Sequence, residues 1–233
     1  THKWVAAGAV AAMLTAGAVW FWWARPDAPS LLAISPQQGS WRESALSWSG
    51  EWMAFSDGET PSRRDIWVSR GDGSSAERLF ADPFLDQDPT ISSDGRFVAF
   101  RSNRVPEGVY EFDRSTRSIR SVVPGGHLPR YSPDGRWLLY ATTNDQADPP
   151  RALKNQWFVA PARGGQARAL AEDLAVTRAI WSPDSQSVLL QTRLPQRLSF
   201  NSLWRRRLDS PRPELVSDWG GQVFFLCGVT PDG

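Results

Sequence analysis

The chain is poor in the residues that most often carry chemistry or cross-links. Its 233 residues include one cysteine, Cys227, and two histidines, His2 and His127. A single cysteine cannot form an internal disulfide, which excludes the cross-linked secreted scaffolds. One cysteine and two distant histidines also provide no pair at the ligand spacing of a zinc site.

An excess of charge of either sign is also lacking. The chain carries 26 basic and 25 acidic residues, a formal net charge of +1. Nucleic acids and anionic membrane surfaces usually attract proteins with a clustered basic excess. We therefore expect no nucleic-acid contact by the folded part of the chain.

Catalytic and cofactor motifs are missing as well. There is no Gly-x-Ser-x-Gly elbow, and His127, expected in a loop between repeats, has no companion histidine in the folded part. Gly71–Ala76 resembles a dinucleotide-binding loop, but the short strand Glu77–Phe80 follows it in place of a helix. The aspartates of the turns lack the alternating ligands of a calcium loop. We expect no catalytic residue, cofactor or metal in this chain.

The N-terminus contains a long apolar segment. Trp4–Ala24 has no charged residue, and as a helix it would span about 30 Å, the thickness of a bilayer's hydrocarbon core. Tryptophans lie at both of its ends, where membrane interfaces favour them. This pattern predicts a transmembrane helix with short flanks in residues 1–25, followed by a linker and first strand in 26–42. A cleaved signal peptide is the second interpretation, because His2-Lys3 is basic and Ala16–Ala18 resembles a cleavage site.

The remainder of the chain is built from a repeat. Tyr131–Tyr140, with the sequence YSPDGRWLLY, joins a proline-aspartate-glycine turn to an apolar strand. Its copies are Leu46–Phe55, Ile91–Phe100 and Trp181–Leu190, and Val229–Gly233 opens a fifth. The glycine positions Gly50, Gly95, Gly135, Ser185 and Gly233 are spaced by 45, 40, 50 and 48 residues.

Periods of 40 to 50 residues with short strands are typical of propeller blades. In the first unit, Glu43–Trp48, Trp52–Phe55, Asp65–Ser69 and Glu77–Phe80 read as four strands joined by turns. The predicted fold is therefore all-β: a partial β-propeller in 43–233, of about four four-stranded antiparallel blades plus the start of a fifth, preceded by the transmembrane helix.

Each residue type of the Pro-Asp-Gly turn has a physical role. Proline presets φ, aspartate accepts a backbone hydrogen bond, and glycine adopts the left-handed conformation that follows. Ser185 lacks that freedom, so we expect strain or a different turn in its copy. The apolar residues four positions earlier are expected to fill the space between neighbouring blades, and most tryptophans of the repeats are expected to serve packing: Leu46, Ile91, Tyr131 and Trp181.

Four charged residues lie opposite those apolar positions on the first strand of each unit: Glu43, Asp88, Arg130 and Arg178. The first strand of a blade is the innermost, so these side chains are expected to face the central channel. Their mixed charge would suit a polar ligand or a peptide at one mouth of the channel. A solvated channel lip is the alternative interpretation and the more common role of such residues.

The Ser-Pro-Asp-Gly turn, the strand after it, the Asp-Ile-Trp-Val strand at 65–68 and the hairpin at Gly164-Gly165 resemble the WD40-like repeat of TolB-like β-propellers. The resemblance runs from about Glu43 to the end, and the copies at Ser49-Gly50 and Asp184-Ser185 depart from it. Propellers of this family usually have six or more blades, so we expect the repeats to form an open arc. A membrane span directly before such repeats is similar to bacterial signalling proteins in which a winged-helix regulator or a serine/threonine kinase domain precedes the span. The resemblance implies a propeller outside the cytoplasm.

These patterns predict a binding or sensing role and indicate no particular reaction. We expect a membrane-anchored, non-catalytic propeller that senses or binds a protein, a peptide or a small polar ligand at one face. Two alternatives remain: the propeller of a prolyl-oligopeptidase-like peptidase, or a stand-alone periplasmic TolB-like scaffold. The first residue is not methionine and the last turn is interrupted, so we expect both ends to be cuts in a longer protein.

Overall fold

The computed structural model describes residues 43–60, 62–143, 155–171, 174–193 and 200–218. All described residues belong to one compact unit, Ser35–Gly233. The predicted transmembrane helix, the linker and the fifth turn lie outside the described residues. Within the described ranges, no helix has the length and apolar character needed to cross a membrane.

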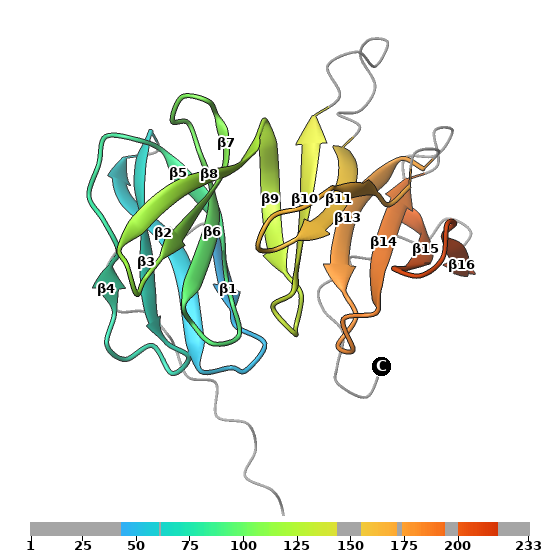
Figure 1. The fold of residues 1–233 in the computed structure, drawn as a ribbon, viewed down its shortest axis with the longest axis horizontal. Helices are drawn as coiled ribbons and strands as arrows, with labels where there is room; N and C mark the ends of the chain where they lie inside the picture. Colours follow the sequence, from blue (N-terminus) through green and yellow to red (C-terminus); the bar gives the residue numbers. More distant parts are fainter. Residues whose placement is uncertain (1–42, 61, 144–154, 172–173, 194–199, 219–233) are drawn as a thin grey trace, which may run out of the picture. The chain divides into compact units, whose positions relative to one another are not determined.

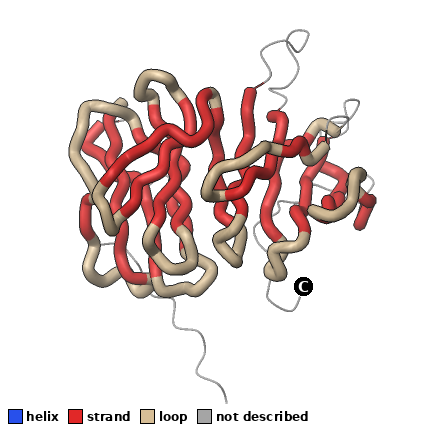
Figure 2. The backbone as a smooth tube through the Cα atoms, viewed as in Figure 1, coloured by secondary structure: helices blue, strands red, loops and turns tan. Residues whose placement is uncertain are grey.

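Sixteen strands form four antiparallel sheets (Figures 1 and 2), each joining four consecutive strands. Each sheet is called a blade. Blade 1 contains β1 (Glu43–Leu46), β2 (Trp52–Thr60), β3 (Arg63–Arg70) and β4 (Glu77–Arg78), and blade 2 contains β5 (Asp86–Ile91), β6 (Phe97–Ser102), β7 (Gly108–Asp113) and β8 (Ser118–Pro124). Blade 3 contains β9 (Gly126–Tyr131), β10 (Trp137–Thr143), β11 (Asn155–Pro161) and β12 (Arg168–Ala169), and blade 4 contains β13 (Val176–Trp181), β14 (Ser187–Arg193), β15 (Phe200–Arg207) and β16 (Glu214–Asp218). The prediction of four four-stranded antiparallel blades is confirmed.

The apolar core lies between blades. One cluster joins Ala54 and Ile66 of blade 1 to Val98 and Phe100 of blade 2. A second cluster joins blade 2 to blade 3, and a third joins blade 3 to blade 4. A strand that is covered on both faces needs apolar residues on both. This explains why the second strand of a blade, such as Trp137–Tyr140, has consecutive apolar residues and no alternation of apolar and polar ones.

Three of the four predicted inter-blade anchors are buried as expected. Ile91, Tyr131 and Trp181 are 1–2% exposed, and each belongs to one of the three clusters. The prediction is wrong for Leu46, which is 57% exposed. Each cluster joins one described blade to the next, so Leu46 on the first strand of blade 1 has no preceding blade to pack against among the described residues.

Three of the four described turns are held by a serine and an aspartate together. Asp134 Oδ1 accepts hydrogen bonds from the Arg136 amide at 3.0 Å and the Ser132 hydroxyl at 2.6 Å. Ser132 Oγ in turn accepts the amide of Trp137 at 3.0 Å. The same three bonds recur around Asp94 and around Asp184. The predicted role of the aspartate is confirmed, and the serine is a second structural residue that the sequence reasoning did not identify.

The turns are also bonded to one another across blade boundaries. Ser49 Oγ donates to the Ser93 carbonyl at 2.8 Å, and Ser93 Oγ donates to the Pro133 carbonyl at 2.7 Å. The Asp134 amide then donates to Ser185 Oγ at 3.0 Å. A series of hydrogen bonds thus links all four blades at one end of their strands.

Ser185 forms the same turn as the glycines and does so in a strained conformation. Its φ is 60°, close to the 69° of Gly135 and the 71° of Gly95. A side chain in the left-handed region costs roughly 1 kcal/mol. The strain that the sequence predicted is therefore present, and the hydroxyl that replaces glycine supplies the bond to the Asp134 amide.

Substitution of Ser185 separates these two contributions. Ser185→Ala keeps the strained conformation and removes the acceptor, so it is expected to lower the free energy of unfolding by about 1 to 2 kcal/mol. Ser185→Gly also removes the acceptor but relieves the strain, so its cost should be smaller. Urea unfolding measures the free energy of unfolding of both variants. A larger loss for glycine than for alanine would contradict this interpretation of the turn.

The turns should also make the fold sensitive to acid. The hydrogen bond from the Ser182 hydroxyl and then the one from the Gln186 amide lower the pKa of Asp184 below its ordinary value of 3.8. A carboxyl whose pKa is lower in the folded state contributes stability above its ordinary pKa and loses that contribution as the pH falls through its folded pKa. Asp184→Asn is expected to flatten the loss of unfolding free energy below about pH 4. An unchanged pH profile in urea unfolding between pH 2 and 6 would contradict this role.

Candidate ligand-binding site at the inner strands

The four predicted channel residues lie on the first strands of successive blades, and the structure couples them electrostatically. Burial and then the charge of Glu43 raise the pKa of Asp88, whereas Arg130 acts to lower it. Burial lowers the pKa of Arg130, with Asp88 opposing this effect and the like charge of Arg178 adding to it. A hydrogen bond of 2.8 Å from the Asp88 amide to Glu43 Oε2 connects blade 1 to blade 2 directly.

Irregularities of the inner strands lie beside three of these four residues. The pairing of β5 with β6 shifts register between Gln87 and Thr90, beside Asp88. The pairings of β9 with β10 and of β13 with β14 also shift, next to Arg130 and Arg178. Asp88 has a left-handed φ of 51°. Such bulges redirect side chains and are common next to functional sites, and β1 pairs with β2 without one.

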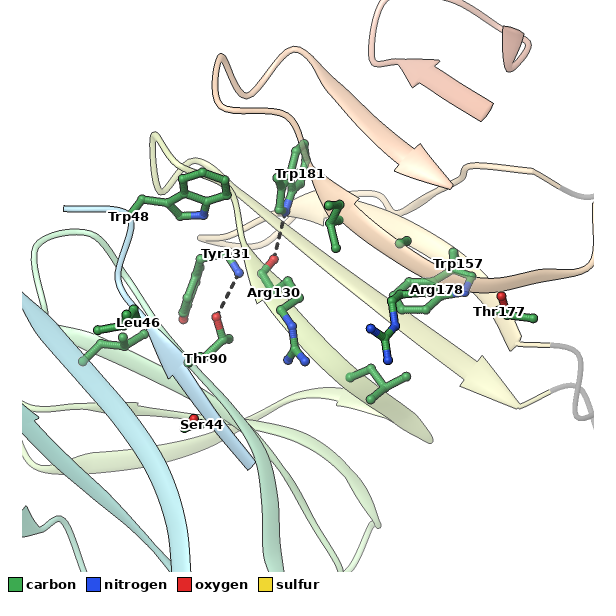
Figure 3. Close-up of a pocket in the computed structure, with 15 residues that line it drawn as sticks. Ser44, Leu46, Trp48, Thr90, Arg130, Tyr131, Trp157, Thr177, Arg178 and Trp181 are labelled. Atoms are coloured by element: carbon green, nitrogen blue, oxygen red, sulfur yellow. Dashed lines mark hydrogen bonds between the residues drawn. The ribbon is translucent and has the colours of Figure 1, made fainter. Parts of the chain in front are cut away.

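A cavity of about 510 Å³ lies along these strands (Figure 3). Its lining comes mainly from β1, β5, β9 and β13. Arg130 and Arg178 are the charged residues among those that line it, and Glu43 and Asp88 lie outside the lining. The structure therefore brings the four predicted residues into one coupled group but gives the cavity itself a positive character.

Aromatic and aliphatic side chains form the remainder of the wall. Figure 3 shows Leu46 and Trp48 on the side of blade 1 and Trp181 on the side of blade 4. The indole of Trp181 donates to the Arg130 carbonyl at 3.1 Å, so it holds the backbone of one arginine. Trp48 is 43% exposed and Leu46 is 57% exposed.

Trp48 is a residue that the sequence reasoning did not assign to the site. The repeat pattern treated Leu46–Phe55 as an imperfect copy and most tryptophans as packing residues. The signal was available: Trp48 takes the turn position that serine or proline occupies at Ser93, Pro133 and Pro183. A large aromatic residue at an exposed turn position has no packing reason.

The chemistry of the cavity suits an anion. A guanidinium carries five N–H donors in a planar fork that matches a carboxylate. For Arg130 the structure shows one side-chain hydrogen bond, from Nη1 to the Pro129 carbonyl at 2.7 Å. Arg178 is exposed at the cavity.

Other titratable groups have structural explanations. His127 lies on β9, and the prediction of an inter-blade loop is wrong because Gly126–Tyr131 pairs with β10 as a strand. Its Nε2 is 3.2 Å from Asn155 Oδ1. In the part of the chain that the structure describes, no three His, Cys, Asp or Glu residues gather as a metal site would require.

Comparisons with known proteins agree with this architecture at the level of the fold. No family model matches the chain. A curated relative, the "Uncharacterized peptidase YuxL" of Bacillus subtilis, is 28% identical over 140 residues, which are 54% of this chain and 20% of the relative. The chain thus spans about a fifth of the length of that protein.

Solved structures are similar over most of the chain. TolB from Acinetobacter baumannii matches with a TM-score of 0.62 and 17% identity, covering 79% of this chain and 45% of TolB. The acylaminoacyl peptidase of Pyrococcus horikoshii matches with a TM-score of 0.57 and 15% identity, covering 78% of this chain and 32% of the peptidase. The described residues therefore have a TolB-like β-propeller fold, which the peptidases share.

Proposed function

We propose that this chain is the binding propeller of a membrane-anchored bacterial signalling protein, that it is not itself catalytic, and that it lies outside the cytoplasm. Its partner would be a protein, a peptide or a small polar ligand held at the inner strands. The observation that carries the binding role is the group of charged residues on the four described inner strands beside a cavity with an exposed Trp48. The anchor rests on the uncharged segment Trp4–Ala24 in the sequence.

The arrangement supports a sensing role for a physical reason. The cavity is lined by residues of all four described blades. A ligand bound there can therefore change how the blades pack against one another and the hydrogen bonds that link their turns. A membrane helix attached to blade 1 would then transmit the change. Because a ligand shifts an equilibrium only through its different affinity for two states, the sensing role requires such a difference.

Membrane topology tests the proposal. An epitope placed after Gly233 in the complete protein is expected to be cleaved by protease added to spheroplasts, and an epitope before Thr1 is expected to be protected. The reverse pattern would contradict an extracytoplasmic propeller. N-terminal sequencing of the mature protein tests the anchor, since cleavage near Ala16–Ala18 would indicate a signal peptide and a stand-alone periplasmic scaffold.

The propeller of a peptidase is the second candidate function. The match to the uncharacterized peptidase of Bacillus subtilis favours it, together with the likeness to acylaminoacyl peptidase. The full-length protein would then contain a serine nucleophile in another domain. Labelling of the full-length protein by a fluorophosphonate probe would support this candidate, and a lack of labelling would favour the signalling role.

A further inference from the structure

We propose that the cavity along the inner strands binds a carboxylate carried by a peptide next to an apolar or aromatic residue. Arg130 and Arg178 would receive the carboxylate, and Trp48 would contact the apolar side chain. This inference rests on the proposed binding function and specifies the ligand class of the same site.

The charges of the site select an anion. Both charged residues of the cavity lining are arginines, and they come from neighbouring blades. Glu43 lies outside the lining, and its Oε2 already accepts the Asp88 amide at 2.8 Å. Both arginines therefore line the cavity while both carboxylates lie outside its lining, and an anion in the cavity would relieve the repulsion between the two guanidiniums.

The same acidic pair limits how much negative charge the site prefers. Asp88 and Glu43 interact electrostatically with Arg130 and offset part of its charge. A single negative charge fits this balance better than a doubly charged phosphate, which the two carboxylates would repel more strongly. The ligand group that the site favours is thus a carboxylate, from a chain terminus or from an acidic side chain.

The apolar wall explains the second half of the ligand. Exposed apolar side chains that cluster around a concave surface mark a binding site, whereas isolated ones need no explanation. Trp48 is substantially exposed, and it lines the cavity that contains the arginines together with the aromatic residues Tyr131 and Trp181. An aromatic side chain carried beside the carboxylate would cover the Trp48 ring and add specificity.

Calorimetric titration of the full chain with four short peptides tests the inference. Acetyl-Gly-Gly-Phe carries a free terminal carboxylate, and its amide is the matched control. Acetyl-Gly-Glu-Phe-Gly-amide carries the charge on a side chain, with the Gln peptide as its control. We expect saturable binding of at least one carboxylate peptide, weakened by added salt, and at least tenfold weaker binding of its uncharged control.

Variants assign that binding to the cavity. Arg178→Gln is expected to raise the Kd at least tenfold, and Arg130→Gln should do the same. Arg212→Gln is the control, because Arg212 is exposed between β15 and β16 and the structure shows hydrogen bonds for its main chain alone. Arg178 is exposed, so its variant is expected to fold, and its melting curve is recorded to check this. Trp48→Ala should weaken binding of the Phe peptides more than that of matched Ala peptides.

Equal affinities for the unsubstituted chain and Arg178→Gln would overturn the inference, as would equal affinities for the carboxylate peptides and their uncharged controls. Tighter binding of a phosphoserine peptide than of the Glu peptide would contradict the preference for a single charge. None of these results affects the topology assay, so failure of this inference and failure of the proposed function remain distinguishable.

Discussion

Replacing Glu111 by alanine is expected to destabilise the propeller by about 3 kcal/mol. Glu111 lies on β7 with 3% of its side chain exposed, and it joins blade 2 to blade 3. Its Oε2 accepts the hydroxyl of Tyr131, and its Oε1 accepts Arg120 Nη2 at 2.8 Å and Arg163 Nη1 at 3.2 Å. The substitution leaves the buried Tyr131 hydroxyl without this acceptor. Both arginines are about half exposed, so water can solvate them, which places the cost at the lower end for a broken buried ion pair.

Glu107 provides the matched control for this prediction. It pairs with Arg101 at 2.6 Å, but its side chain is 56% exposed and that of Arg101 is 42% exposed. Glu107→Ala should therefore change the free energy of unfolding by less than about 1 kcal/mol. Glu111→Gln should fall between the two alanine variants, because the amide oxygen still accepts the Tyr131 hydroxyl. Urea unfolding followed by circular dichroism measures the free energy of unfolding of all three variants. Equal losses for Glu111→Ala and Glu107→Ala would contradict the role of buried Glu111 in joining blade 2 to blade 3.

Trp181→Ala is expected to have a comparable or larger effect, a loss of about 3 to 5 kcal/mol. Trp181 is 2% exposed and packs in the cluster between blades 3 and 4 with Trp157 and Val188. Its truncation creates a cavity in that cluster and removes the indole donor of the Arg130 carbonyl. The same variant should also weaken ligand binding, since the indole holds the backbone of a residue that lines the site.

Trp48→Ala is the control with the same chemical change. Trp48 is 43% exposed, so its loss should alter stability by less than about 1 kcal/mol while it weakens binding at the cavity. Trp48→Ala is thus expected to affect binding alone, whereas Trp181→Ala affects both stability and binding. Similar melting temperatures for both variants, measured by differential scanning calorimetry, would show that the assignment of Trp181 to packing is wrong.

The blades could be predicted from the sequence because the local and global requirements agree. The turn at Ser132–Gly135 needs particular residues for its φ angles, and the apolar strand after it must pack on both faces. The turn residues and the apolar strand recur with every blade, so chance does not explain the pattern. The series of hydrogen bonds between turns was not predictable, because Ser49, Ser93 and Ser185 occupy different positions of the repeat and meet only after the blades pack.

The binding role of the candidate site residues stays a prediction. Alternation along the first strands was enough to assign Glu43, Asp88, Arg130 and Arg178 to one face. No local sequence signal specified their division into two arginines in the cavity wall and two carboxylates outside it. Trp48 was missed for a different reason: a departure from the repeat was interpreted as loss of a structural feature, when it supplies a wall of the cavity.

The location of the bound ligand tests the central claim of this account most directly. The indole N–H resonances of the tryptophans can be followed by NMR while acetyl-Gly-Gly-Phe or the Glu peptide is added. We predict that the resonances of Trp48 and Trp181 shift with the concentration of the bound peptide, while those of Trp67 and Trp204 stay unchanged. Shifts at Trp67 or Trp204 without shifts at Trp48 would place the ligand elsewhere and contradict a binding site at the inner strands.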